Sequence, residues 1–573
     1  MGPRGSFGEC AEAGSERTMI QAVTAQGVVS GANAPSPFEQ VSLFRGIPYA
    51  APPVGDRRWA PPEDPEPWEG TRECVTVAPS ALQQFHNDWF SREGYVPGFY
   101  GTTPPMDEDC LYLNVATAAT SPDERLPVYV WFHGGGLTNG FAVDAPTDPS
   151  LLASKGIVVV SVAQRLNVFG YLALPQLREE QGKSGNYGFL DQLKAMEWIY
   201  ANIAQFGGDP ANVTVGGQSG GAQKAAALAA VPQSIGRIRR VVSVSGLKWM
   251  QPLVAQSVQE ERGRTLLRRL GLDPDSTLEE LRALDASIFL APVDRQLLPD
   301  DMVTDDVLPY ANLREGVERY GCDIDWLSGM VLGETEPFAL SAGNPDFVAP
   351  SVREPFGSVS ELDAHFRSLL GDLAPEEGVS TIAGLDEEDA WDAARVIAGY
   401  GLAGSERTNI SRNLMLNRLF GRYLDGLGGN GSVYNYLWSH RIPASSTDAG
   451  TSRDPRNTLG WHGSDTWFVF GTVRAGISPE RPWTRRDHQL ADVMSTYVAN
   501  FVRTGDPNGA NLPGWPRAND DFGYIEVIDD VVAHAGCTSA IDVLTRAFVE
   551  REYGLEGQIP DSALGSESTG SCR

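Results

Sequence analysis

The chain has 573 residues, of which 42% are hydrophobic and 21% are charged. This composition supplies enough apolar side chains for a large packed core and excludes a mainly disordered chain. Lys and Arg total 45 against 74 Asp and Glu, and the resulting net charge of −29 repels nucleic-acid phosphates and anionic lipid surfaces. The sequence has no run of about 18 apolar residues, so we expect neither a nucleic acid nor a membrane as a partner.

Both ends of the sequence are poor in apolar residues. Residues 1–18 lack the apolar segment of a secretory signal peptide, and we interpret them as a disordered extension or a tag. We expect residues 19–555 to form a single domain and residues 556–573 to form a mobile tail. Because no export signal is present and the six cysteines form no C-x-x-C pair, we expect a cytoplasmic protein with reduced thiols and no metal site.

Short β-branched runs alternate with helical patterns through the first two-thirds of the chain. The runs are almost continuously apolar, which is typical of strands buried on both faces of a mostly parallel sheet. Strands are predicted at 127–132, 157–162, 213–215, 240–245, 330–333 and 433–438, and helices at 187–204 and 222–230. Residues 256–430 are predicted to be mainly helical. This order favours one large α/β domain with helical insertions.

A candidate nucleophile, Ser219, lies at the centre of a G-x-S-x-G pattern at residues 217–221. A β-branched run precedes the pattern and an Ala-rich helical run follows it. This strand–turn–helix context is that of a nucleophile elbow, in which the serine hydroxyl projects at a helix N-terminus. The alternative is a glycine-rich turn in an ordinary βα unit, and the context makes that interpretation the weaker one.

A second glycine-rich turn, at residues 133–136 (His-Gly-Gly-Gly), follows the predicted strand 127–132. In an HGGG-type turn, backbone N–H groups face the oxyanion of a tetrahedral intermediate, and glycine leaves room for the substrate oxygen. A flexible loop is the alternative interpretation. Because both motifs follow predicted buried strands, their joint occurrence favours a catalytic serine.

Longer stretches around these motifs resemble the type-B carboxylesterases, the cholinesterase-like family of α/β-hydrolases, in a bacterial-type form. Residues 206–221 are similar to the family's serine signature, and residues 108–115 (EDCLYLNV) resemble its second signature. The resemblance extends from about residue 21 to residue 551. It implies an α/β-hydrolase fold with a large, mostly parallel central sheet flanked by helices, and with helical insertions over the active-site gorge. It also implies that the oxyanion-hole donors are the amides of Gly135, Gly136 and Gly220.

The family order of catalytic residues is serine, acid, histidine. The sequence around His462, TLGWHGSD, resembles the family's histidine loop, and histidine can accept and return a proton near neutral pH. For the acid, the resemblance favours Glu336, which follows the predicted strand 330–333. Glu334 and Asp346 remain alternatives, because this loop is shorter than the family pattern and contains proline where glycine is common.

The resemblance also indicates residues around the triad. Ser245 is a candidate hydrogen-bonding residue next to it, and Trp249, Phe338 and Trp461 are candidates for lining the acyl pocket or the gorge. Ordinary core packing is the alternative for each of these aromatic residues.

The sequence departs from the family pattern near the elbow and the histidine. Gln218 stands where Glu is common before the serine, Gly220 replaces a common Ala, and Asp465 stands where Glu is usual three residues after the histidine. The first two departures change side chains next to the serine but remove no group that reacts. The third alters a hydrogen bond expected to be buried.

The cysteines depart from the family pattern as well. Cys110 occupies a family cysteine position, but the position of its usual partner, near Ala81, has no cysteine. Cys74 lies seven residues before that position and could pair only if the loop shifted. We therefore expect no disulfide between Cys74 and Cys110.

Together these features predict a serine hydrolase that cleaves small-molecule carboxylic esters through an acyl-enzyme, as a monomer or homodimer. The catalytic residues would be Ser219, His462 and Glu336, and the resemblance implies neither a metal nor an organic cofactor. An amidase or carbamate hydrolase with the same triad is an alternative, as is a catalytically silent binding protein. The negative charge is interpreted as a solubility feature.

Overall fold

The computed structural model describes most of the chain between Ile20 and Pro560. The gaps lie at 84–102, 248, 292, 294–296, 332–357, 385–386, 388–409, 447, 449–454, 456–459 and 537–539. The expectation for residues 1–18 therefore lies outside the described residues. At the other end, Ile559 is buried and the carbonyl of Pro560 accepts a hydrogen bond from Arg422 at 2.7 Å. Residues 556–560, expected in the tail, thus belong to the packed structure.

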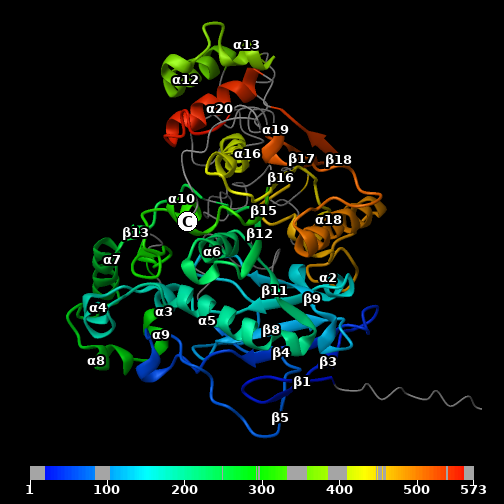
Figure 1. Cartoon of the computed structure of the whole chain (residues 1–573). Helices are drawn as coiled ribbons and strands as arrows, with labels where there is room; N and C mark the ends of the chain where they lie inside the picture. The colour runs from blue at the N-terminus through cyan, green and yellow to red at the C-terminus, as the bar shows by residue number, and fades with distance from the viewer. Residues whose placement is uncertain are drawn as a thin grey trace, which may run out of the picture.

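An 11-stranded sheet forms the centre of the molecule (Figure 1). Its seven inner strands are parallel, and the outer strands at both edges are antiparallel. In spatial order the strands are β18 (Val531–His534), β17 (Tyr524–Val527), β16 (Val433–Trp438), β15 (Asp325–Val331), β12 (Ile238–Val244), β11 (Gly208–Gln218), β9 (Leu126–Phe132), β10 (Val158–Val162), β8 (Tyr112–Thr117), β4 (Ser42–Pro48) and β3 (Ala32–Asn33). The predicted mostly parallel α/β sheet is confirmed.

Strand β9 shows why the apolar runs are continuous. Val128, Val130 and Phe132 pack into a core on one face of the sheet, whereas Tyr129 and Trp131 pack into a separate core on the other face. Because successive side chains of a strand point to opposite faces, a strand covered on both sides needs apolar residues at every position.

Helices cover the two faces of the sheet. The first core contains side chains of α5 (Tyr187–Asn202), α6 (Gly220–Ala229) and α16 (Ile410–Gly426). The second contains side chains of α2 (Ser150–Ser154), α17 (Thr466–Phe470) and α18 (Arg485–Thr504). The predicted helices 187–204 and 222–230 correspond to α5 and α6, which end within two residues of the expected positions.

The remaining elements lie around this framework. Short sheets are formed by β1 (Gln21–Val23), β2 (Val28–Ser30) and β5 (Thr71–Glu73), by β6 (Ser80–Ala81) and β7 (Met106–Asp107), and by β13 (Val254–Ala255) and β14 (Val303–Thr304). The other α-helices are α3 (Asn167–Tyr171), α4 (Pro175–Gln181), α7 (Gln256–Arg269), α8 (Leu278–Arg282), α9 (Ala286–Phe289), α10 (Leu313–Tyr320), α12 (Val359–Leu370), α13 (Val379–Ala383), α19 (Ala518–Asp521) and α20 (Ala540–Glu552). In Figure 1, α12, α13 and α20 lie together at one end of the molecule, away from α4, α7 and α8.

The cysteines agree with the sequence interpretation only in part. Cys74 and Cys110 are buried and free, which confirms that they do not pair. Cys322, however, is disulfide-bonded. The expectation that all thiols are reduced is therefore wrong.

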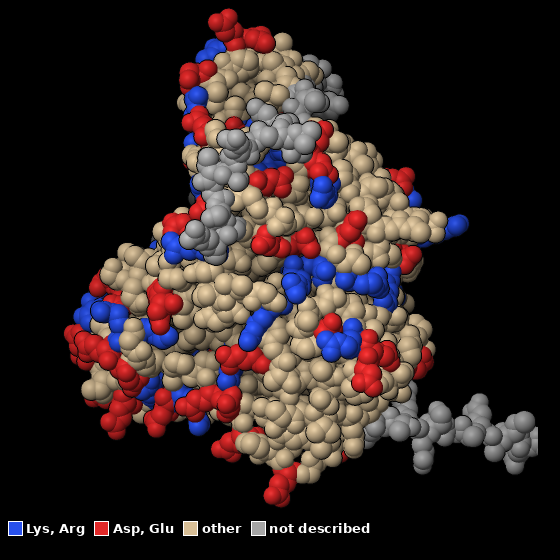
Figure 2. Space-filling model, in the orientation of Figure 1, with Lys and Arg blue, Asp and Glu red and all other residues tan. Residues whose placement is uncertain are grey.

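The charge distribution is visible on the molecular surface. Acidic side chains lie in several separate groups over the face shown in Figure 2, and basic side chains lie between them. Within the described residues, no helix is both long enough and apolar enough to span a membrane.

Candidate active site

Ser219 lies at the sharp turn between β11 and α6. Its backbone has φ +57° and ψ −123°, a strained conformation for a residue with a Cβ atom. Its amide donates a hydrogen bond to the carbonyl of Val244 at 2.8 Å, and its side chain is half-buried. The predicted strand–turn–helix context of the serine is therefore present, with the strand, the strained residue and the helix in direct succession.

Two glycines of this turn are required by close backbone contacts. A Cβ atom at Gly217 would lie under 3.0 Å from the backbone of Gly221, and one at Gly221 would lie under 3.0 Å from the carbonyl oxygen of Phe132. Phe132 is the last residue of β9, so the start of α6 rests directly on the neighbouring strand. The glycine pattern thus sets how closely α6 approaches the sheet below Ser219.

The glycine-rich turn after β9 lies beside Ser219. Gly135 and Gly136 have φ +89° and +64°, which L side chains rarely adopt. A Cβ atom at Gly134 would lie 3.4 Å from Cβ of Ser219, and one at Gly220 would lie under 3.0 Å from the carbonyl oxygen of Gly136. The structure therefore brings the three predicted oxyanion-hole glycines together next to the candidate nucleophile.

His462 lies in a turn between β16 and α17. Its side chain is buried, and its Nε2 lies 3.0 Å from Nε2 of Gln218, the residue before Ser219. The turn is closed by a hydrogen bond from the Ser464 amide to the carbonyl of Trp461 at 2.8 Å. The predicted histidine is thus placed against the nucleophile elbow, although it comes from a distant part of the chain.

Charged residues support the segment around His462. The guanidinium of Arg481 forms an ion pair with Asp448 at 2.6 Å, and both side chains are fully buried. Arg481 also lies 5.6 Å from the ring centroid of Trp461, the residue before the histidine. Asp465 is buried as well and accepts a hydrogen bond from the Tyr436 hydroxyl at 2.7 Å.

The segment that would supply the acid lies outside the described residues. These residues include Glu334, Glu336 and Asp346, and also the candidate pocket residue Phe338. The strand before the segment, β15, runs parallel to β12, and Gly329 of β15 is opposite Val244. The chain therefore leaves β15 at the edge of the sheet that carries Ser219.

Ser245 directly follows β12, and Trp461 directly precedes His462. The other described aromatic candidate is Trp249. Ser245 has φ +51°, and its buried Oγ has no hydrogen-bond partner among the described residues. Trp249 packs between Phe420 and Tyr423 of α16, with ring centroids 5.0 Å apart in both cases. Both Trp249 and Trp461 are 1% exposed and belong to the packed cores. Their role as pocket residues stays a prediction.

Three buried polar residues near the oxyanion turn were missed from the sequence. The Gln83 carboxamide accepts a hydrogen bond from the amide of Gly140 at 2.7 Å and donates one to its carbonyl at 2.9 Å. Gln164 and Lys224 contact His133, the first residue of the turn. None of the three lies in a catalytic pattern, so only their burial identifies them.

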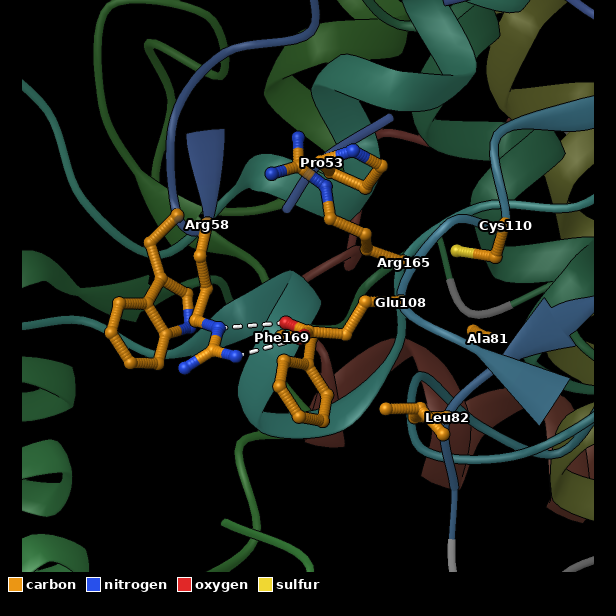
Figure 3. Close-up of a pocket in the computed structure, with 9 residues that line it drawn as sticks. Pro53, Arg58, Ala81, Leu82, Glu108, Cys110, Arg165 and Phe169 are labelled. Atoms are coloured by element: carbon orange, nitrogen blue, oxygen red, sulfur yellow. Dashed lines mark hydrogen bonds and ion pairs between the residues drawn. The ribbon is translucent and has the colours of Figure 1, made fainter. Parts of the chain in front are cut away.

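A small cavity is lined in part by Glu108 and Cys110, which belong to the predicted second signature (Figure 3). It is closed by the guanidinium of Arg58, which donates to both carboxylate oxygens of Glu108 at 2.6 and 2.7 Å. Ala81 and Cys110 both line it, so the missing partner cysteine would have pointed into this space. Its volume of about 10 Å³ is at the lower limit for one water molecule, and it is not a substrate pocket.

Among the described residues, no group of three or more His, Cys, Asp or Glu side chains is placed to hold a metal ion. The residues brought together around Ser219 are instead a hydroxyl, an imidazole and a set of backbone amides. That combination is suited to nucleophilic attack on a carbonyl group with stabilisation of the resulting oxyanion.

The chain is similar to known proteins over most of its length. The model of the carboxylesterase family matches residues 18–534. A medium-chain fatty acyl-CoA hydrolase precursor from Anas platyrhynchos is 30% identical over 511 residues, which cover 85% of this chain and 84% of that protein. A liver carboxylesterase from Sus scrofa is 28% identical and covers 88% of each chain.

Solved structures show the same fold. A carboxylesterase from Geobacillus stearothermophilus superposes with a TM-score of 0.68 at 25% identity, over 91% of this chain and 99% of that chain. A PNB esterase superposes with a TM-score of 0.67, also at 25% identity, over 92% and 99% of the two chains.

Proposed function

This chain belongs to the carboxylesterase family, whose members hydrolyse carboxylic esters, and from that premise we propose that it works through an acyl-enzyme formed on Ser219. The observation that carries the proposal is the position of Ser219 itself. Its strained backbone lies between β11 and α6, beside the glycines of the oxyanion turn and one residue from the contact with His462.

In the acylation step, Oγ of Ser219 attacks the ester carbonyl carbon and His462 accepts the hydroxyl proton. The electron pair of the carbonyl bond moves to the oxygen, which becomes an oxyanion. When this intermediate collapses, the bond to the alcohol breaks and the alcohol takes the proton from His462. The acyl group remains bonded to Ser219, and water repeats the sequence to release the carboxylic acid.

The oxyanion would be held by the amides of Gly135, Gly136 and Gly220. The absence of side chains at Gly220 and Gly136 supports this role, because a Cβ atom at Gly220 would collide with the carbonyl of Gly136. Amides fixed in place before the reaction stabilise the developing charge without reorganisation, and loss of one such donor typically costs about 10²–10³ in kcat.

The acid that orients His462 would be Glu336, with Glu334 and Asp346 as alternatives. The position of β15 supports an acid from this segment, because the chain leaves the sheet one strand away from the turn at Ser245. A carboxylate there would fix the imidazole tautomer and stabilise the imidazolium formed during attack.

We propose neutral carboxylic esters as the substrate class. One relative is described as a liver carboxylesterase, which supports an ester substrate. The net charge of −29 disfavours a substrate with several phosphate charges, because the electrostatic field of the protein would slow its approach. The same argument disfavours nucleic acids.

The proposal is tested by the hydrolysis of p-nitrophenyl esters of increasing acyl length. Wild type should release nitrophenol with a burst equal to the enzyme concentration, and Ser219→Ala should show no burst and a loss of about 10⁴ or more in kcat/KM. Ser154→Ala is a matched control, because Ser154 is on α2, on the face of the sheet opposite α6, and should retain full activity.

Two further substrates separate the alternatives. A p-nitroanilide or carbamate cleaved faster than the ester of the same acyl group would favour an amidase or carbamate hydrolase. An acyl-CoA cleaved faster than the neutral ester, at low salt, would contradict the substrate class. Absence of turnover on every ester in the wild type would mean a silent binding protein and would overturn the proposal.

A further inference from the structure

The inference concerns a lysine buried beneath the oxyanion turn. Lys224 lies on α6, five residues after Ser219, and its side chain is 0% exposed. Long side chains on a helix point toward its N-terminus, which directs Nζ back to the turn that carries the nucleophile. The chain has five lysines, and no carboxylate in the described part of the chain pairs with Lys224. Three others each contact a carboxylate: Lys155, Lys183 and Lys194.

Lys224 contacts two residues that lead into the active site. Its Nζ donates a hydrogen bond to the backbone carbonyl of His133 at 3.1 Å. It donates a second to Oε1 of Gln164 at 2.9 Å, with the Gln164 carboxamide oriented so that its Nε2 donates to the carbonyl of Val162 at 3.2 Å. Oε1 of Gln164 also lies 2.7 Å from Nε2 of His133.

These contacts join the ends of three central elements. His133 follows β9, Gln164 follows β10, and Lys224 is on α6. The ring of His133 is in turn fixed against the next residue, with its Nδ1 2.8 Å from the carbonyl of Gly134. The buried amine is therefore connected to the first two residues of the turn whose amides face the oxyanion.

A lysine at this position lowers the stability of the folded protein. Burial lowers the pKa of Lys224 to about 7, since the charged form loses its hydration. A positive charge near the N-terminus of α6 is also disfavoured by the helix dipole. The three positions that follow it on α6, residues 225–227, are buried alanines, so packing alone does not require a polar group here. The residue's hydrogen bonds are what distinguish it from an apolar side chain.

Nearby charged groups do not account for Lys224. Asp191 forms a buried ion pair with Arg165, the residue after Gln164. Asp191 accepts hydrogen bonds from the Arg165 guanidinium at 2.7 and 2.9 Å. His133 is the titratable group coupled to Lys224, whose charge contributes, after burial, to lowering the pKa of His133.

We propose that Lys224 is a positioning residue that fixes the backbone of the oxyanion turn through the carbonyl of His133 and through Gln164. Residues 134–136 are all glycine, and a glycine backbone has more accessible conformations than any other. Anchoring the turn at His133 restricts these conformations before substrate binds, which is the condition for effective oxyanion stabilisation. The inference rests on the proposed function, because it assigns a role within the same site.

The experiment compares Lys224→Met, Gln164→Met and wild type on one p-nitrophenyl ester, with rates normalised to active sites titrated by a fluorophosphonate. Lys224→Met should lower kcat about 10–100-fold and change KM less than about threefold, since the turn acts on the oxyanion and not on the bound ester. Gln164→Met should have a smaller effect of about 3–10-fold. Lys155→Met is the matched control, because Lys155 contacts Asp492 and Thr496 far from Ser219, and it should leave kcat unchanged.

A trifluoromethyl ketone provides the readout that a merely structural role would not move. Ser219 adds to its carbonyl carbon and the oxygen becomes an anion in the oxyanion hole, as in the intermediate. Its inhibition constant should rise in Lys224→Met by the same factor as kcat falls. Equal kcat and inhibition constant in Lys224→Met and wild type would overturn the inference.

The remaining outcomes are also decisive. If Lys224→Met does not fold, Gln164→Met alone decides: unchanged kcat and inhibition constant in that variant overturn the inference. A fall in kcat with an unchanged inhibition constant also overturns it, because the oxyanion hole would then be intact. A wild type that hydrolyses no ester would instead refute the proposed function itself.

Discussion

The two sides of the active site are built differently. On one side, Ser219 and the oxyanion turn come from short connections at the ends of β11 and β9. Glycines, which have no Cβ atom, allow these two connections to lie in contact. On the other side, His462 comes from the long connection between β16 and α17, and the acid is expected from the segment after β15. The first side is thus defined by backbone, and the second by side-chain contacts between distant segments.

This difference determines what each side tolerates. Backbone contacts between α6 and β9 leave no room for even one methyl group, because neither element can move independently of the sheet. The histidine side relies on an ion pair and on aromatic packing around Arg481, which can readjust more easily. Substitutions on the two sides should therefore lower the activity by different amounts and for different reasons.

After loss of the nucleophile itself, the largest effect is expected for the acid on the histidine side. Glu336→Gln removes the charge that would orient His462 while keeping the shape of the side chain, and kcat should fall about 10³–10⁴-fold with little change in KM. The measurement is steady-state hydrolysis of a p-nitrophenyl ester. Glu334→Gln is the control and should stay within about threefold of wild type. The reverse pattern would identify Glu334 as the acid, and two unaffected variants would point to Asp346.

On the nucleophile side, Gly221→Ala should lower kcat about 10²–10³-fold, the scale of a lost oxyanion donor. The new Cβ atom would lie under 3.0 Å from the carbonyl oxygen of Phe132 and would push α6, and with it the elbow, away from β9. Gly514→Ala is a matched control, since a Cβ atom there meets no other atom within 4 Å. Near-normal activity of Gly221→Ala would show that this side is as adaptable as the other.

The smallest effect concerns the pH dependence of stability caused by Lys224. The pKa of Lys224 is about 7 in the folded protein against an ordinary value of 10.5, so between these values the unfolded chain binds a proton that the folded chain does not. The buried charge thus lowers stability most at and below pH 7, and this cost disappears as the pH rises toward 10.5. Relative to Lys224→Met, the wild type should gain about 2–3 kcal/mol in free energy of unfolding between about pH 7 and pH 9.

Urea denaturation of both proteins at several pH values provides this measurement. Lys155→Met serves again as the control and should follow the wild-type curve. Parallel curves for wild type and Lys224→Met would contradict the lowered pKa and would place Lys224 in contact with water.

The sequence was most informative where local pattern and tertiary structure agree. Strands β9, β10 and β16 lie within one residue of their predicted limits, because their continuous apolar runs have no competing interpretation. Strand β11 is longer than the predicted residues 213–215, since its last residues, Gly216 to Gln218, have low strand propensity. They form a strand because they pair with β12, and Gly216 and Gly217 pair with β9 on the other side.

The active-site residues also differ in how well the sequence predicts them. Ser219 and the oxyanion glycines are recognisable because their backbone geometry requires glycine at fixed spacings. Lys224 could not be recognised, because a lysine in an Ala-rich helix resembles an ordinary exposed position, and only packing against the sheet reveals that it is buried. The acid depends on a connection whose length differs from the family pattern, so the sequence favours Glu336 but does not exclude Glu334 or Asp346.

The closed cavity around Cys110 has a practical consequence. The thiol is 1% exposed, and burial raises its pKa well above the ordinary value, so the reactive thiolate is scarce in the folded protein. Alkylation of Cys110 therefore requires the packing between Ala81, Arg58 and Glu108 to open. Its labelling rate in rising urea, read by mass spectrometry, would act as a natural reporter of how often this side of the molecule opens.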